Sequence, residues 1–160
     1  MKEQEQHIGR AARAKMQWWI SIPFFVVHLM PLGMIWTGVT GAHLALCAAL
    51  YFVNMFFITA GYHRYFSHRT YKTSRFFQFI LAFGAQMSAQ KGALWWAAHH
   101  RVHHKYSDQP EDPHSPKAGF WWSHMGWIVS EESHNTQLEN VNDFTRYPEL
   151  VWLNRLHLVP

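Results

Sequence analysis

The chain has 160 residues, of which 17% are aromatic and only 15% are charged, whereas charged residues make up roughly a quarter of an ordinary soluble domain. This composition predicts that some apolar side chains contact an apolar environment other than a self-contained core. The formal net charge is +4, but the basic residues flank apolar segments instead of forming one basic and aromatic stripe, which argues against a nucleic-acid-binding protein.

Two uncharged segments of about 20 residues follow a short polar N-terminus. Residues 18–37 read WWISIPFFVVHLMPLGMIWT and residues 42–61 read AHLALCAALYFVNMFFITAG. Each is long enough to cross the hydrocarbon core of a bilayer as a helix. The prolines in the first segment are tolerated in membrane helices, where neighbouring groups satisfy the freed carbonyls. We therefore expect a transmembrane helical hairpin over residues 18–61, and not a buried helix pair or a cleaved signal peptide.

Positive charge lies at the two open ends of this hairpin, while its connector, residues 38–41, is uncharged. Cytoplasmic loops of membrane proteins carry an excess of Lys and Arg. Residues 1–17 are therefore predicted to be a cytoplasmic N-terminal segment, and both termini are predicted to be cytoplasmic. The basic residues that flank the spans are Arg10, Arg13, Lys15, Arg64, Arg69, Lys72 and Arg75.

A third apolar stretch, residues 76–98, is interrupted by three glutamines and Lys91. If it crossed the bilayer, the histidines before and after it would lie on opposite faces of the membrane, so we interpret it as interfacial or re-entrant. Residues 99–160 hold eight of the ten acidic residues and predict a cytoplasmic cap of short helices and loops. The predicted fold class is all-α, with residues 62–160 as a cytoplasmic and interfacial histidine-rich region.

Five of the thirteen histidines form two clusters beside these apolar segments. The first is His63-Arg-Tyr-Phe-Ser-His68, and the second is His100-Arg-Val-His103-His104. The single cysteine, Cys47, excludes disulfides and paired-cysteine zinc sites within one chain. The clusters therefore indicate metal binding by imidazole, a ligand that suits iron, zinc and copper alike.

The spacing of the histidines differs between the clusters. His100, His103 and His104 stand at i, i+3 and i+4, so that a helix presents all three on one face. His63 and His68 would lie about 140° apart around a straight α-helix. Either the helix distorts, or the two imidazoles serve two metals held between helices, and the sequence favours the second arrangement, a dinuclear site. His99, at i+4 from His103, has a weaker claim to be a ligand.

These residues resemble the membrane-bound fatty acyl desaturases, specifically the stearoyl-CoA desaturase-like delta-9 group. The likeness covers nearly the whole chain from the first span onward. The matching segments are GYHRYFSHRTYK at residues 61–72, WWAAHHRVHHKYS at residues 95–107, Asp112-Pro-His114, and GFWWSHMGW at residues 119–127.

The resemblance implies a non-haem site of two iron ions that uses O2 and two electrons to form a cis double bond, at the delta-9 position, in a saturated acyl chain. No catalytic residue is implied beyond the metal ligands. The implied partners are the lipid bilayer, a fatty acyl substrate on coenzyme A or another carrier, and an electron donor protein such as cytochrome b5 or ferredoxin. The implied iron ligands are His63, His68, His100, His103 and His104, and Lys72, Arg75 and Lys117 are weaker candidates for contacts with the phosphates of the acyl carrier.

One feature of the family pattern is absent from the sequence. The family has a third histidine box, H-x-x-H-H, after two further membrane spans, and His124, His134 and His157 stand alone. We therefore expect the chain to be an N-terminal portion of a four-span desaturase. The alternatives are a related membrane hydroxylase with the same iron ligands, or a catalytically inert membrane hairpin that binds partners or metal.

Overall fold

The computed structural model describes residue 9 and residues 11–160. It is all-α, as predicted, and within these residues the β-structure consists of an isolated bridge between Met16 and Ser130. Most of the predicted segment 1–17, including His7 and Arg10, lies outside the described residues. The main helices are α2 (Ile22–Leu29), η1 (Met30–Gly33), α3 (Met34–Thr37), α4 (Gly41–Phe56), η2 (Phe57–Ser67), α5 (Arg75–Gln86), α6 (Ala93–Lys105) and α8 (Pro148–Arg155).

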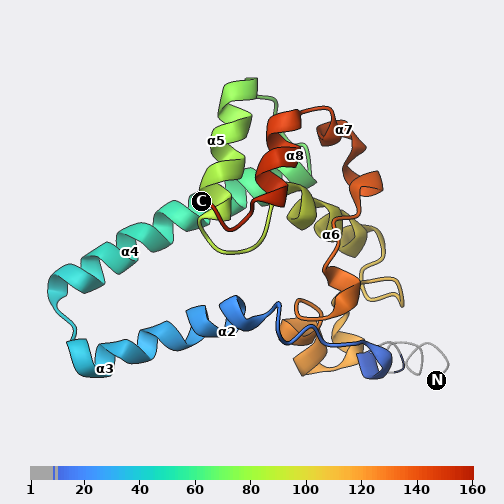
Figure 1. The fold of residues 1–160 in the computed structure, drawn as a ribbon. Coiled ribbons are helices and arrows are strands. Elements are labelled where there is room, and N and C mark those ends of the chain that lie inside the picture. The colour runs from blue at the N-terminus through green and yellow to red at the C-terminus, as the bar shows by residue number, and fades with distance from the viewer. Residues whose placement is uncertain (1–8, 10) are drawn as a thin grey trace.

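Two apolar arms extend from the body of the molecule and are joined at their far ends (Figure 1). The first arm consists of α2, η1 and α3, and the second is α4, which continues into η2. Gly38 makes the turn with a φ of +70°, which glycine adopts without steric cost. Thr40 then caps α4, because its hydroxyl accepts from the His43 amide while the His43 ring accepts from the Thr40 amide.

The second arm is long and apolar enough to cross a bilayer. Its helix runs without interruption through Gly41–Ser67, whereas the apolar helix of the first arm, Ile22–Thr37, is shorter. The helices α2, α3 and α4 contain no buried residue, and Trp36 is 81% exposed and Phe52 70% exposed. Continuous apolar surfaces of this size mark sites of contact with a partner or a membrane.

The body packs η2, α5, α6 and α8 around one apolar core. The helices η2 and α5 approach closely at Gly61, where an added Cβ would lie 3.1 Å from the Leu81 carbonyl oxygen. Burial of these large apolar side chains is the main stabilising contribution to the body. The fully buried side chains include Tyr62 and Phe66 of η2, Leu81 of α5, Leu94 of α6 and Leu150 of α8.

The third apolar stretch, residues 76–98, forms parts of two helices. The chain leaves α5 after Gln86 and enters α6 at Ala93 through a turn in which Ala89 and Lys91 both have left-handed φ, of 59° and 61°. The buried hydroxyl of Tyr62 donates to the Lys91 carbonyl oxygen at 2.6 Å and fixes this turn against η2. As a result α6 packs against η2, which brings the second histidine cluster to the first.

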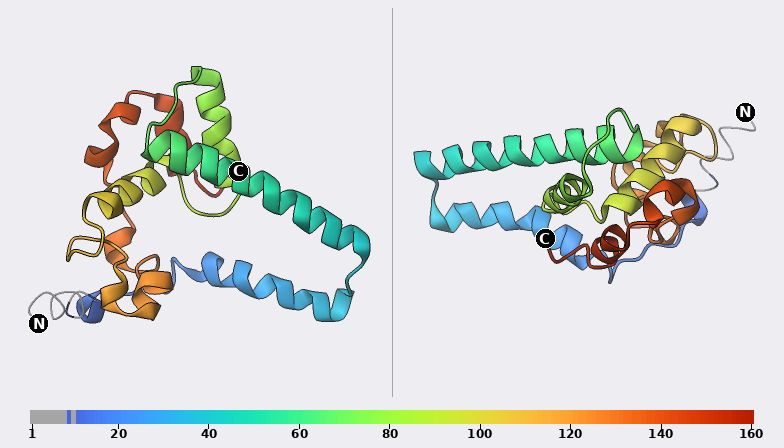
Figure 2. Two further views of the ribbon diagram at one scale, coloured as in Figure 1. Left: turned by 180° about the vertical axis from the view of Figure 1, so that it is seen from behind. Right: turned by 90° about the horizontal axis from the view of Figure 1, so that it is seen from above.

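The C-terminal part of the chain forms short helices, and α8 among them packs against α5 and α6. These are η3 (Pro116–Ala118), η4 (Trp122–Gly126), η5 (Glu131–Ser133), η6 (Leu138–Val141), α7 (Asn142–Thr145) and α8. Both views in Figure 2 place them at the end of the molecule away from the tips of the arms. The Asn154 side chain of α8 accepts from the Trp95 amide at 2.9 Å, which satisfies a free donor in the first turn of α6.

We expect the substitution Gly92→Ala to destabilise the body by about 1–3 kcal/mol, the usual cost of overpacking. A Cβ at Gly92 would lie 2.7 Å from the Asn154 Cα, so α8 would have to move away from α6. The measurement is denaturant unfolding of the detergent-solubilised chain. Gly33→Ala is the control, because no heavy atom lies within 4 Å of its added Cβ and its φ of −58° suits alanine. Equal stability of both variants would contradict the packing of α8 on α6.

Candidate metal centre

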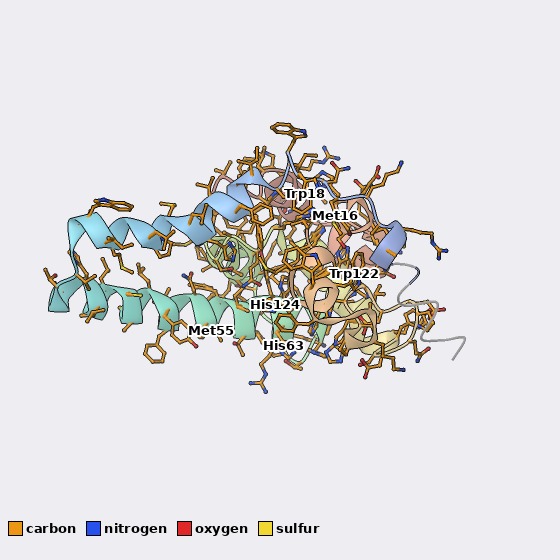
Figure 3. The ribbon with its side chains drawn as sticks, turned by 90° about the horizontal axis from the view of Figure 1, so that it is seen from below. Met16, Trp18, Met55, His63, Trp122 and His124 are labelled. Atoms are coloured by element: carbon orange, nitrogen blue, oxygen red, sulfur yellow. The ribbon has the colours of Figure 1, made fainter. Side chains whose placement is uncertain are left out.

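Four imidazoles from two helices meet where the second arm enters the body. His63 lies on η2 and His68 follows its last turn, while His100 and His104 stand one turn apart on α6; Figure 3 marks His63 at the inner end of the arm. The Nε2 atoms are 3.1 Å apart in the first pair and 3.0 Å apart in the second. Between the pairs, the rings of His68 and His104 are 4.5 Å apart. We call these four side chains the four-imidazole cluster.

The two histidines of the first pair meet because η2 is π-helical. Hydrogen bonds in a π-helix join residues five apart, and here the His68 amide donates to the His63 carbonyl oxygen at 3.0 Å. Residues five apart therefore lie on the same face, and not about 140° apart as on an α-helix. The structure thus has the distorted helix, which brings His63 and His68 to one side. The assignment of these two imidazoles to one metal or to two stays a prediction.

The spacing within the four-imidazole cluster suits a metal ion. Metal–imidazole bonds are about 2.0–2.1 Å long, so two ligands at a right angle around one ion are about 3 Å apart. The two Nε2–Nε2 separations agree with this value, and all four candidate ligand nitrogens lie within 4.8 Å of one another. Four imidazoles offer a donor set that fits iron, zinc or copper.

Burial and mutual proximity disfavour the protonated form of three of these imidazoles, those of His68, His100 and His104. Burial, followed by the nearby imidazoles of His104 and His63, lowers the pKa of His100 to about 3. Burial and neighbouring imidazoles also lower the pKa of His68 and of His104 below the ordinary value. Because a metal binds neutral imidazole, the lowered pKa values of these three histidines favour the uptake of a cation.

His103 lies beside the four-imidazole cluster and not within it. Its ring centroid is 5.5 Å from that of His104. Its Nδ1 is 3.0 Å from Oδ1 of Asp112, and its ring stacks on His114 at 4.1 Å. The sequence analysis noted the Asp-Pro-His segment only as part of a family likeness and missed its contact with a candidate ligand. The sequence feature that could have indicated this contact is the carboxylate of Asp112, eight residues beyond the second cluster.

The Asp112 carboxylate is ionised in this environment. Burial by itself raises the pKa of Asp112, but the hydrogen bond from His103 and those from the amides of Asp108 and His114 outweigh burial and lower the pKa. The candidate ligand His103 therefore contacts a negative charge that no solvent shields, since the Asp112 side chain is fully buried.

His99 is directed away from the candidate ligands. Its Nδ1 lies 2.9 Å from the Trp95 carbonyl oxygen, and its ring packs against Trp95 and Trp127. Burial lowers the pKa of His99 to about 4. Its Nε2 is buried and has no hydrogen-bond partner among the described residues. The structure therefore places His99 in the packing of the body.

Arg101 joins the two helices that carry the candidate ligands, a role that the sequence analysis missed. Its guanidinium donates to the carbonyl oxygens of Phe66 at 2.6 Å and Ser67 at 3.2 Å, which end η2. It also pairs with Asp143 at 2.9 Å and donates to the Asn140 carbonyl oxygen at 2.9 Å. The sequence signal was an arginine inside the second histidine cluster, but its partner lies 42 residues away.

The three basic residues considered as substrate contacts differ in their surroundings. Arg75 makes a two-pronged ion pair with Glu149, with both distances 2.7 Å, that docks α5 on α8. Lys72 is exposed in the turn before α5, and Lys117 is exposed in η3. Contacts from these residues to an acyl carrier remain predictions.

Comparison with known proteins gives a family match. A family model described as "Fatty acid desaturase" matches residues 36–158. A "Probable acyl-CoA desaturase" of Schizosaccharomyces pombe is 38% identical over 104 residues, which are 64% of this chain and 22% of the relative. The "sn-1 stearoyl-lipid 9-desaturase" of Anabaena variabilis is 30% identical over 141 residues, which are 87% of this chain and 51% of the relative. An "Acyl-CoA desaturase" of Cyprinus carpio is 50% identical over 72 residues, which are 45% of this chain and 22% of the relative. The chain thus spans between about a fifth and a half of the length of these relatives.

We expect the metal-free chain to lose stability as the pH falls from about 6.5 towards 3. The pKa of an unfolded histidine is about 6.5, whereas that of folded His100 is about 3. Between these values the unfolded state binds the proton and the folded state does not, so the contribution of neutral His100 is fully present above about pH 6.5 and is lost below it. The slope is at most about 1.4 kcal/mol per pH unit for one proton.

The measurement is denaturant unfolding in detergent with a chelator, followed at several pH values. The substitution His100→Gln removes the titrating group, so the difference between the original chain and the variant isolates its share of the slope. Identical pH slopes for the two proteins would contradict a depressed pKa at His100.

Proposed function

We propose that this chain, which belongs to the fatty acid desaturase family, acts in the O2-dependent conversion of a saturated fatty acyl chain to a cis-unsaturated one, with the double bond at the delta-9 position. Relatives named as 9-desaturases support this position. The single observation that carries the proposal is the convergence of His63 and His68 with His100 and His104 in the four-imidazole cluster. Two of these histidines come from η2 and its C-cap and two come from α6, so the arrangement depends on the fold of the body.

Iron is the metal that we propose for this centre, as two ions. The four-imidazole cluster would hold one ion, and His103 would be a ligand of the second. Bound iron with O2 supplies the oxidising power that breaks unactivated C–H bonds, which side-chain acids and bases cannot break. The residues of the chain hold the imidazoles in place. Trp96, for example, stacks on the His100 ring at 4.5 Å.

The two arms are proposed to form a transmembrane helical hairpin over residues 18–61. Support comes from the length of the second arm and from the exposed apolar side chains of both arms. The basic residues at the body end favour a cytoplasmic location for residues 1–17 and 62–160. On this proposal the four-imidazole cluster lies close to the cytoplasmic membrane surface, where an electron donor protein can reach it and a membrane-embedded acyl chain can enter.

The proposed partners follow from this chemistry. The substrate is a saturated fatty acyl chain on coenzyme A or another carrier, and Lys72, Arg75 and Lys117 are proposed to contact the phosphates of that carrier. The reaction consumes two electrons that the acyl chain does not supply, because O2 is reduced to two molecules of water by two electrons from the substrate and two more. A protein such as cytochrome b5 or ferredoxin is proposed to deliver the second pair.

We expect His100→Gln to weaken binding of Fe(II) at least about 10-fold, since even the loss of an outer partner of a metal ligand costs 10–100-fold. The measurement is elemental analysis of the detergent-purified chain after anaerobic equilibration with graded Fe(II). His124→Gln is the matched control, because the His124 ring stacks on Phe120 and lies outside both groups of candidate ligands. Equal iron binding by both variants would contradict a metal role for the four-imidazole cluster.

We expect membranes that contain the complete, iron-loaded enzyme with these residues, an electron donor protein, O2 and a stearoyl substrate to form a cis-9 alkene. The measurement is mass spectrometry of the extracted acyl chains, with His100→Gln as the inactive control. An alcohol as the main product would favour the membrane hydroxylase. Iron binding without either product would favour the inert metal-binding hairpin.

A further inference from the structure

Three nitrogen atoms lie within hydrogen-bond distance of the Asp112 carboxylate. Its Oδ1 lies 3.0 Å from Nδ1 of His103 and accepts from the His114 amide at 3.1 Å. Its Oδ2 accepts from the Asp108 amide at 3.0 Å. The side chain has no exposed surface, so these contacts replace water around the charge. A buried carboxylate with such partners is strongly fixed in position.

The contact with His103 decides which ring nitrogen remains for other partners. A carboxylate only accepts hydrogen bonds, so the Nδ1 atom that faces Asp112 must carry the proton. In a neutral ring the other nitrogen, Nε2, then holds the free lone pair. Nε2 is also the nitrogen through which His63 and His68, and His100 and His104, approach each other. All five candidate ligands therefore present the same ring nitrogen.

We infer that Asp112 is a positioning residue, which holds His103 in the tautomer protonated at Nδ1 and presents its Nε2 to the metal centre. This inference rests on the proposed function. Histidines that bind metals commonly donate their second ring N–H to a carboxylate, which fixes the ring and strengthens the ligand. Here Asp112 comes from the turn after α6, so it is held independently of the helix that carries His103.

The ring of His103 is also held from the side. His114 stacks on it with an angle of 27° between the ring planes, and the other neighbour of His114 is Trp127, at 5.0 Å between ring centroids. Lone pairs of imidazole lie in the plane of the ring, so two nearly parallel rings do not direct them to one point. This geometry argues against His103 and His114 as joint ligands of one ion and favours a packing role for His114.

The test compares Asp112→Asn with the original chain. The amide either turns its NH2 group to His103, which forces the proton to Nε2, or turns it to the Asp108 amide, which leaves two donors facing each other. Glu111→Gln is the matched control, since it removes one negative charge from the exposed neighbouring residue. The first readout is the tautomer of His103 in the metal-free protein, from nitrogen-15 NMR of the histidine-labelled chain in detergent, with His103→Gln to assign the signal.

The expected result is an Nδ1-protonated His103 in the original chain and in Glu111→Gln, with loss of this tautomer in Asp112→Asn. The second readout is Fe(II) binding, expected to weaken about 10–100-fold in Asp112→Asn and to stay unchanged in the control. A purely structural role would leave the tautomer of any folded variant unchanged.

Two outcomes would overturn the inference, and a third would separate a failure of the proposed function from a failure of the inference. An Nε2-protonated His103 in the original chain overturns it, even if Asp112→Asn does not fold. An unchanged tautomer and unchanged Fe(II) binding in folded Asp112→Asn also overturn it. If the original chain binds no iron, the proposed function fails, whereas an Asp112-dependent tautomer at His103 still supports the positioning role.

Discussion

The guanidinium of Arg101 bonds the end of one of the two helices that carry the candidate ligands to the other. The last carbonyls of a helix have no partners within that helix, and Arg101 satisfies two of them, at Phe66 and Ser67, from the neighbouring helix α6. Asp143 balances the charge of Arg101. Because His100 and His103 flank Arg101 in the chain, the same contact that ends η2 also sets the position of α6 relative to His63 and His68. The metal site is therefore a product of the packing between two helices.

The molecule combines two surfaces with opposite requirements. The arms expose apolar side chains that suit a bilayer, while the body buries its core and surrounds it with ion pairs such as the one between Arg75 and Glu149. The change occurs along one continuous helix, where α4 passes into η2. The packing of η2 against α5 depends on a close contact at a glycine. A Cβ at Gly84 would overlap the ring of Phe57, so η2 and α5 can pack only because this position lacks a side chain.

The candidate ligands His100 and His103 have different surroundings. His100 is held by stacking on Trp96 and by burial, with no carboxylate among its described contacts. His103 instead has the Asp112 carboxylate at Nδ1. A carboxylate partner makes an imidazole a stronger ligand, whereas burial against aromatic rings disfavours its protonated form. His100 and His103 therefore have outer partners of different kinds.

Sequence alone determined those features that depend on residues close together in the chain. The apolar helices of the arms follow from composition, the shared face of His100 and His104 follows from the period of an α-helix, and the family follows from the short histidine segments. Tertiary structure decided the rest. The π-helical turn that aligns His63 with His68, the break between α5 and α6, and the contacts of Arg101 with Asp143 depend on packing between segments up to 42 residues apart. The spacing in the sequence groups five histidines. The fold brings four of them together and pairs His103 with Asp112. The reason is that the direction of a side chain is set by the helix that carries it and by the residues packed against that helix.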